Sequence, residues 1–253
     1  MRQVSSKRSP ACDIRIGTSG WHYKHWIGTF YPPKIAGSKM LAYYFEHFDT
    51  VELNNSFYRL PRENALISWR DSTPTNFIFA AKGSRFLTHM KKLKDAEQGL
   101  ARYLDAIETL GHKLGPILFQ LPPNWELDLD RFRTFLALLP ACHRYAFEFR
   151  NATWSVPAIY HVLTSQNMAY CAFHLAGEHS PVQLTADFTY VRLHGPGGKY
   201  QGSYSEEILR EWANRIRAWR RELKAIYVYF DNDEAGYAAR DALRLKSLVA
   251  GSD

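Results

Sequence analysis

A chain of 253 residues, 46% of them hydrophobic, is long enough for one domain with a large core. Its formal net charge of +7 permits a phosphate-bearing small molecule or a nucleic acid as partner, without requiring either. No apolar run approaches the ~18 residues that span a bilayer, so neither a membrane span nor a membrane partner is expected.

The first residues, MRQVSSKRSPAC, are basic and rich in serine, and they lack the apolar segment of a secretory signal. We expect residues 1–12 to form a disordered tail before a single domain at 13–250. Three cysteines, Cys12, Cys142 and Cys171, lie far apart and form no CxxC motif. Their odd number argues against a disulfide framework and favours a reducing cytoplasm.

Short apolar runs with strand character recur along the whole chain. They lie at residues 14–19, 50–54, 77–82, 117–121, 145–150, 169–174, 190–194 and 226–231. Their starts are about 30 residues apart on average, which is the size of a strand–helix unit. Eight strands that alternate with helices predict an α/β fold of the TIM type, a closed (β/α)8 barrel. The alternative, an open doubly wound sheet, usually has fewer strands.

Helical periodicity fills most of the intervals between these runs. Expected helices follow Ser38, cover 63–71 and 94–111, and start near Asp128, Ser155, Ser205 and Asp233. Only fifteen residues separate His174 from Tyr190, and they include Gly177 and Pro181. The sixth helix is therefore expected to be absent or reduced to a turn.

The run TVELN at 50–54 carries polar residues inside a strand that should be buried. Successive side chains on a strand point to opposite faces, so Val51 and Leu53 face the helices while Glu52 and Asn54 point into the barrel. The same alternation directs a further set inward: Lys82, Gln120, Glu148, Arg150, His174, Arg192, His194, Tyr229 and Asp231. These side chains gather at the C-terminal ends of the strands, where active sites of this fold lie.

Three carboxylates of this set balance three cations, so a structural ion-pair network is an alternative to a ligand site. We favour the site because the fold places catalytic groups at this end of the barrel.

Seven short motifs occur in a fixed order along the chain. They are GTSGW (17–21), ELNNSFYRLP (52–61), THMKKL (88–93), GPILFQLPPNW (115–125), EFRNATW (148–154), RLHG (192–195) and YVYFDNDEAGYAARDA (227–242). Together they resemble the YecE-like family, domain of unknown function 72, from Ile14 to about Leu248. The resemblance implies a TIM-barrel-like fold and brings no established reaction. Asp231 and Asp241 stand where the family commonly has Asn, which leaves a role at position 231 open.

Glu52 and Glu148, on the second and fifth strands, are suited to general acid–base or glycosidic chemistry. With His194 and Asp231 they form the predicted catalytic set. His174 and His194 beside carboxylates are also ligand types for a divalent metal. No local metal-binding motif is present, so the cofactor stays open.

The segment HGPGGKYQGSY follows the seventh strand. Gly197 and Gly198 let backbone N–H groups approach an anion, with Lys199 and Tyr200 beside them, although glycine and proline also simply make turns. The other predicted substrate-binding residues share the inward parity: Asn54, Lys82, Gln120, Arg150, His174 and Arg192.

Residues 82–95 are basic and have aromatic neighbours, which suits a sugar-phosphate chain with stacked bases or simply a solvated helix start. We therefore expect an enzyme that acts at the barrel mouth on a phosphate-bearing substrate, a nucleic acid or a sugar phosphate. The alternatives are a non-catalytic nucleic-acid-binding barrel and a carbohydrate-active hydrolase that uses Glu52 and Glu148. The sequence leaves the substrate, the oligomeric state and catalysis itself open.

Overall fold

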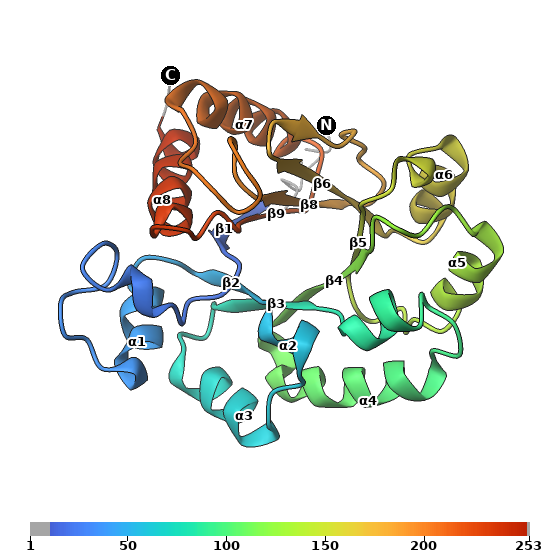
Figure 1. Ribbon diagram of the computed structural model, residues 1–253, viewed down its shortest axis with the longest axis horizontal. Coiled ribbons are helices and arrows are strands. Elements are labelled where there is room, and N and C mark those ends of the chain that lie inside the picture. The colour runs from blue at the N-terminus through green and yellow to red at the C-terminus, as the bar shows by residue number, and fades with distance from the viewer. Residues whose placement is uncertain (1–10, 252–253) are drawn as a thin grey trace, which may run out of the picture.

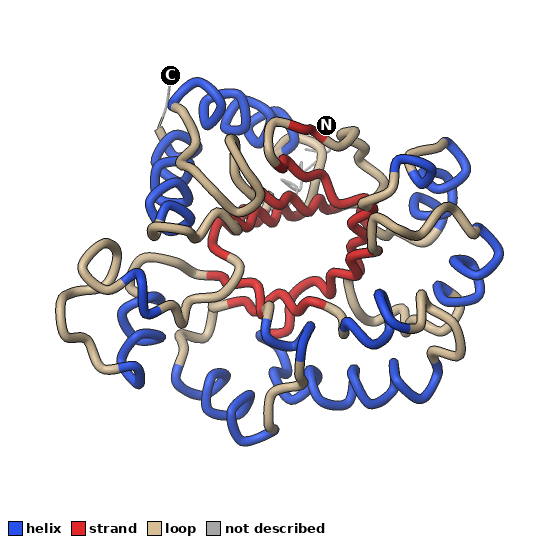
Figure 2. The backbone as a smooth tube through the Cα atoms, in the orientation of Figure 1, coloured by secondary structure: helices blue, strands red, loops and turns tan. Residues whose placement is uncertain are grey.

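The computed structural model describes residues 11–251, and residues 1–10 of the predicted tail lie outside the described part. Figure 1 looks down a ring of strands surrounded by helices, and Figure 2 shows the same ring in red. The parallel strands are β1 (Asp13–Thr18), β2 (Thr50–Leu53), β3 (Ile78–Lys82), β4 (Leu114–Leu121), β5 (Tyr145–Phe149), β6 (Ala169–Leu175), β8 (Phe188–Leu193) and β9 (Ala225–Phe230).

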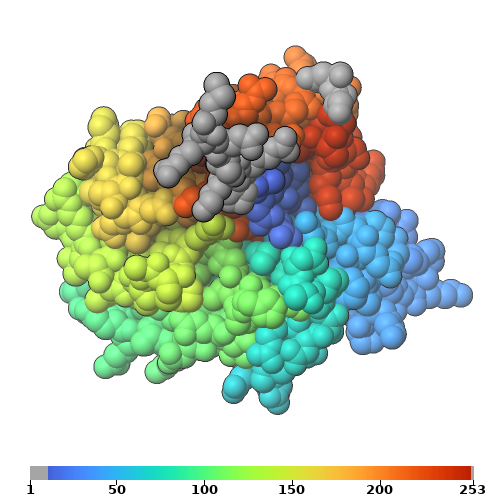
Figure 3. All heavy atoms as spheres, turned by 180° about the vertical axis from the view of Figure 1, so that it is seen from behind, coloured from blue at the N-terminus to red at the C-terminus, as the bar shows by residue number. Residues whose placement is uncertain are grey.

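The strands follow one another in the order β1-β9-β8-β6-β5-β4-β3-β2. Every hydrogen-bonded pair along this path is parallel. Each predicted run lies on one of these strands, so the prediction of a TIM-type barrel is confirmed. Figure 3, from behind, shows the first described residues, in blue, beside the red C-terminal helix, which packs against β1.

The barrel is nearly closed, and its least regular junction lies between β1 and β2. A single bridge pairs Ser19 with Glu52. The phenol of Tyr44 completes the junction, because it accepts from the Thr18 N–H at 3.0 Å and donates to the Thr50 carbonyl at 3.1 Å. Gly17 permits this close approach, since a Cβ there would lie 2.4 Å from the Thr50 carbonyl oxygen.

Helices cover the outside of the ring (Figure 1). They are α1 (Met40–Phe45), α2 (Asn55–Tyr58), α3 (Glu63–Ser72), α4 (Glu97–Ile107), α5 (Leu129–Leu136), α6 (Pro157–Ser165), α7 (Glu206–Trp219) and α8 (Tyr237–Ala250). Short 3-10 segments lie at Lys24–Trp26, Gly37–Lys39, Glu108–Lys113 and Ala152–Trp154, and a π-helical turn at Phe86–Met90. None of the described helices is both long and apolar enough to cross a bilayer.

The connection between β6 and β8 contains no helix, which confirms the prediction of a reduced sixth helix. A two-residue strand, β7 (Glu178–His179), instead folds back antiparallel against β6. Ala176 and Gly177 both have positive φ, 50° and 82°, and make the tight reversal.

The helices predicted near Asp128, Ser155, Ser205 and Asp233 all form, but only two of these four residues cap them. Asp128 caps α5 and Ser205 caps α7, since their side chains accept backbone N–H groups three residues on. Ser155 instead contacts the Tyr170 hydroxyl at 3.0 Å, and α6 starts at Pro157, a residue preorganised for a first helical turn. Asp233 lies in the turn before Gly236, after which α8 begins.

Outward-facing apolar residues pack under the helices in two large clusters. A smaller cluster, which includes Leu118, Cys171 and Tyr227, fills the barrel interior. Apolar side chains therefore occupy much of the interior, and the polar inward residues follow them toward the C-terminal ends of the strands.

Candidate functional site

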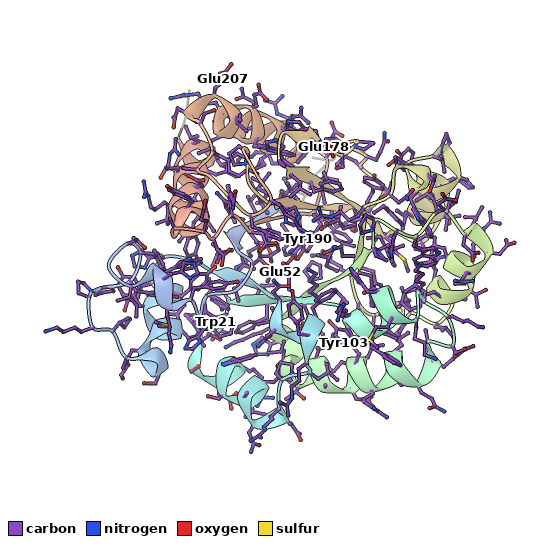
Figure 4. All side chains as sticks on the ribbon, in the orientation of Figure 1. Trp21, Glu52, Tyr103, Glu178, Tyr190 and Glu207 are labelled. Atoms are coloured by element: carbon purple, nitrogen blue, oxygen red, sulfur yellow. The ribbon has the colours of Figure 1, made fainter. Side chains whose placement is uncertain are left out.

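Arg192 of β8 is fully buried in the barrel and organises the charged groups around it. Figure 4 shows Glu52 and Tyr190 inside the strand ring, on the same side as this cluster. The guanidinium binds the Glu52 carboxylate through Nε at 3.0 Å and through Nη2 at 2.7 Å. It also donates to Glu148 at 2.9 Å and to Asp231 at 3.2 Å. One arginine thus joins carboxylates from β2, from β5 and from the residue that follows β9.

Glu52 makes four hydrogen bonds, which use all the lone pairs that a carboxylate offers. Besides the two from Arg192, it accepts from the Ser19 hydroxyl at 2.5 Å and from the Tyr190 hydroxyl at 2.7 Å. The side chain is fully buried. This geometry is suited to holding Arg192 in place, and it leaves Glu52 no free acceptor for a substrate. A catalytic role for Glu52 stays a prediction.

His194 lies next to Arg192 and contacts both a carboxylate and two guanidinium groups. Its Nδ1 is 3.0 Å from Asp231 Oδ2, while Nε2 is 2.7 Å from an Arg150 nitrogen and 3.3 Å from Arg192 Nη1. A carboxylate only accepts and a guanidinium only donates, so the proton belongs on Nδ1 and Nε2 is the acceptor. In this arrangement Arg150 occupies the lone pair that a general base would use.

Glu148 and Asp231 are ionised members of this cluster. Burial by itself would raise the pKa of Glu148, but the charges of Arg150 and Arg192 outweigh burial and hold the pKa well below its usual value. For Asp231, burial is likewise outweighed by Arg192 and by the hydrogen bond to His194, so its pKa is lowered. Only Oδ2 of Asp231 is engaged by these two partners. The other oxygen of this carboxylate is the better placed to meet a substrate.

Lys82 at the end of β3 differs from the two arginines. It is 5% exposed, and its ammonium lies 4.4 Å from the centre of the Phe57 ring. Within residues 11–251 this ammonium has neither a hydrogen bond nor an ion pair. Burial and the positive charge of Arg192 lower its pKa to about 8, even though Glu52, Asp231 and Glu148 act in the opposite direction. Lys82 is therefore a buried cation with free donors.

The inward placement predicted for His174 is wrong. Its backbone is in register with Leu193, which packs outward, and its ring stacks on His179 of β7 at 4.0 Å. Phe173 takes the inward position instead, with its ring 4.6 Å from the Arg150 guanidinium. The alternation of β6 was ambiguous because an aromatic side chain covers a cation there.

The remaining predicted residues divide between the mouth and its surroundings. Gln120 is nearly buried at the end of β4. Gly197 and Lys199 are exposed on the loop after β8. Tyr200 connects that loop to the mouth, because its ring lies 5.6 Å from His194 while its φ of 64° is rare for a bulky residue. Asn54 lies just past β2 and lines a separate cavity.

Ser19 and Tyr190 belong to the cluster but were not among the predicted site residues. Tyr190 has the same strand parity as Arg192, so alternation could have identified it. Ser19 is the last residue of the predicted run 14–19, and alternation from the outward Ile16 would have pointed it inward as well. Among the described residues, no group of three or more histidine, cysteine or acidic side chains is arranged to hold a metal ion. Whether the protein binds a divalent metal stays an open question.

Comparison with known proteins agrees with the sequence motifs. A family model described as "Protein of unknown function DUF72" matches residues 15–253. The chain belongs to this family. The UPF0759 protein YunF of Bacillus subtilis is 29% identical over 273 residues, covering 93% of this chain and 94% of YunF. The UPF0759 protein YecE of Escherichia coli K12 is 27% identical over 139 residues, covering 54% of this chain and 48% of YecE.

Solved structures show the same fold. The DUF72 protein TM1631 of Thermotoga maritima superposes with a TM-score of 0.87 at 27% identity, covering 94% of this chain and all 100% of that one. The DUF72 protein EF0366 of Enterococcus faecalis gives a TM-score of 0.77 at 18% identity, with 95% and 99% coverage, and supports the fold alone. None of these descriptions names a reaction.

Proposed function

We propose that this DUF72 protein is an enzyme that acts at the C-terminal mouth of its barrel on a phosphate-bearing substrate. The observation that carries the proposal is Lys82, whose side chain is 5% exposed, feels the charges of three carboxylates, and has no hydrogen bond or ion pair within residues 11–251. Taking a charge largely out of water is costly, and within the described residues only solvent can meet the free donors of Lys82 Nζ. A bound anion would supply the missing acceptors.

The proposed roles follow from which groups still have unused donors or acceptors. Lys82 binds the anion and, because its pKa is about 8, it is mostly protonated at neutral pH and is able to donate a proton to an oxygen. Arg150 provides a second, fork-shaped donor. Glu52 and Arg192, which are fully buried, hold the other groups in position.

Arg150 also couples binding of the anion to activation of His194 as a general base. It now donates to His194 Nε2 at 2.7 Å. When Arg150 turns to a bound phosphate, Nε2 loses its shortest contact and keeps the longer one of 3.3 Å with Arg192 Nη1, while Asp231 continues to orient the ring through Nδ1. His194 then acts as general base only in the presence of the anion.

The test is calorimetric titration with inorganic phosphate and with sugar phosphates at low salt. An anion raises the pKa of Lys82, so at pH 8, close to the pKa of about 8, binding should take up as much as about half a proton. Buffers of different ionisation enthalpy measure this uptake. Lys82→Met should remove it and weaken binding at least about tenfold, since a charge-assisted contact contributes roughly 1.5–3 kcal/mol. If no anion binds, or if the variant binds equally well, the proposal is wrong.

Turnover over a panel of phosphomonoesters, phosphodiesters and sugar phosphates, with and without divalent metals, then tests catalysis. The free cysteines are consistent with our placing this reaction in a reducing cytoplasm.

A non-catalytic nucleic-acid-binding barrel is the second candidate, and exposed aromatic residues favour it. Tyr58 of α2 is 76% exposed and Phe86 is 44% exposed, and Arg59 and Arg85 are their exposed neighbours in the chain. Stacked bases with neutralised phosphates would use such a surface. Tight, salt-dependent binding of oligonucleotides that drops in Tyr58→Ala, without turnover of any substrate, would favour this candidate. No comparable observation favours a glycoside hydrolase, because Glu52 and Glu148 are both fully buried around one guanidinium.

A further inference from the structure

A cavity of about 760 Å³ lies beside the mouth, outside the strand ring. Its walls come from the segment after β1, the end of β2, and helices α1 and α3. Figure 4 shows Trp21 on this side of the ring, between α1 and α3, whereas Glu52 lies inside. The volume falls within the range of roughly 300–1,000 Å³ that is typical of small-molecule sites.

Aromatic rings form the fixed walls of this cavity. Trp21 and Trp69 meet edge to face, with centroids 5.0 Å apart and planes at 89°. The Trp21 carbonyl accepts a hydrogen bond from the Tyr31 hydroxyl, which anchors that backbone. Gly20 allows the turn before it, since its φ is +87° and a Cβ there would lie 2.7 Å from the Tyr23 hydroxyl. These walls are held by the fold rather than by a ligand.

The polar lining consists of hydroxyls, amides and the His22 imidazole, and it includes an amide without a partner among the described residues. No aspartate, glutamate, lysine or arginine is among the described lining residues. Asn54 makes no hydrogen bond through its side chain within residues 11–251, and its Oδ1 is buried. An unsatisfied buried amide oxygen is unfavourable, and a ligand N–H would satisfy it. Asn55 adds a second amide at the edge of the cavity.

We propose that this cavity, the amide–aromatic pocket, binds a flat, uncharged heteroaromatic ring of the nucleobase type. The ring packs against Trp69, and the Asn54 amide pairs with the donor–acceptor edge of the ring. Amides of asparagine pair with such edges because both present one donor and one acceptor side by side. Because no carboxylate, ammonium or guanidinium is among the described lining residues, a neutral ligand fits this lining better than an ionic one. The lining also offers the hydroxyls of Ser38, Ser68 and Ser72, which a sugar would use, so monosaccharides are included in the test below.

The pocket and the mouth share a wall. Ser19, next to Gly20 of the pocket, donates to Glu52 of the mouth. Burial raises the pKa of Tyr23, which lines the pocket, and the negative charges of Asp231 and Asp233 raise it further. A ligand with a neutral ring and a phosphate could therefore use both places. The proposal for the pocket does not depend on this, because a ring without phosphate is sufficient to test it.

The experiment is calorimetric titration of the intact protein with three kinds of probe. Free nucleosides supply the heteroaromatic ring without phosphate, neutral monosaccharides supply hydroxyl groups without an aromatic ring, and inorganic phosphate supplies the anion alone. We expect nucleosides to bind and monosaccharides not to bind. Trp69→Ala and Asn54→Leu should each weaken nucleoside binding at least about fivefold, as loss of one stacked or paired contact of roughly 1–3 kcal/mol implies. Asn76→Leu, at an exposed position before β3, is the matched control and should leave binding unchanged.

Thermal melting checks that each variant is folded. If Trp69→Ala does not fold, Asn54→Leu alone decides, because it preserves the aromatic walls. Failure of every nucleoside to bind, binding that both variants leave unchanged, or selective binding of monosaccharides would each overturn the proposal. Phosphate binding is scored separately, so a failure of the proposed function at Lys82 is distinguished from a failure of the pocket.

Discussion

Lys82→Met should make the protein more stable, although it removes a charge from a cluster of opposite charges. The pKa of Lys82 falls from 10.5 to about 8 in the folded protein. The folded state therefore holds this proton less well than the unfolded chain, at a cost of about 3 kcal/mol when each pKa unit is worth about 1.4 kcal/mol. Methionine has a similar length, carries no charge and suits the contact with Phe57.

The sign and the pH window follow from the same difference. Below pH 8 both states carry the proton and the full cost is present. Between pH 8 and 10.5 the folded state releases its proton first, so the cost disappears as pH rises. At pH 7 the variant should unfold at a temperature about 6–12 °C higher, given roughly 2–4 °C per kcal/mol for a chain of this size. This advantage should shrink from pH 8 upward and disappear above about pH 10.5.

Urea unfolding at several pH values measures the effect, with Lys113→Met as the matched control. Lys113 is also buried, but its ammonium donates to the Thr73 carbonyl at 2.7 Å, to Thr73 Oγ1 at 3.2 Å and to the Arg70 carbonyl. Its removal leaves those acceptors unpaired and should destabilise the protein. If Lys82→Met is destabilised as well, with no change in pH dependence, then Lys82 is a structural partner of the carboxylates and our reasoning about its free donors is refuted.

Three further variants test the cluster and its support. Arg192→Met should destabilise the fold by about 3–5 kcal/mol in urea, because it leaves buried carboxylates without their cation, whereas Arg210→Met at an exposed ion pair should cost less than about 1 kcal/mol. An equal effect of the two would contradict the role of Arg192. Asp231→Asn removes a negative charge from the mouth and should strengthen phosphate binding at least about fivefold at low salt, with a smaller effect at high salt. An unchanged affinity would mean that the anion binds elsewhere. Tyr44→Phe should lower the free energy of unfolding by about 1–3 kcal/mol, because the Thr18 N–H loses its acceptor; a neutral result would mean that the β1–β2 junction does not depend on it.

The alternation of strands and helices was readable from the sequence because it depends on local patterns. Each apolar run became a barrel strand, and the short interval with Gly177 and Pro181 contained no helix, as expected. Strand parity also identified Glu52, Glu148, Arg192 and their neighbours as inward residues, since a period of two is fixed by backbone geometry alone. Two residues are exceptions: His174 lies where an inward aromatic residue contacts a cation, and Asn54, just past the end of β2, lines the cavity outside the ring.

Only the tertiary structure decided which of these charges are paired. The sequence gives equal weight to Lys82, Arg150 and Arg192, but pairing depends on distances between strands that are far apart in the chain. Arg192 reaches Glu52, 140 positions away, and is fully engaged, whereas Lys82 meets the Phe57 ring. The amide–aromatic pocket is likewise formed by Trp21, Asn54 and Trp69 from three separate segments. Local patterns determine which face of a strand a side chain occupies, and packing between distant segments determines which groups that side chain contacts.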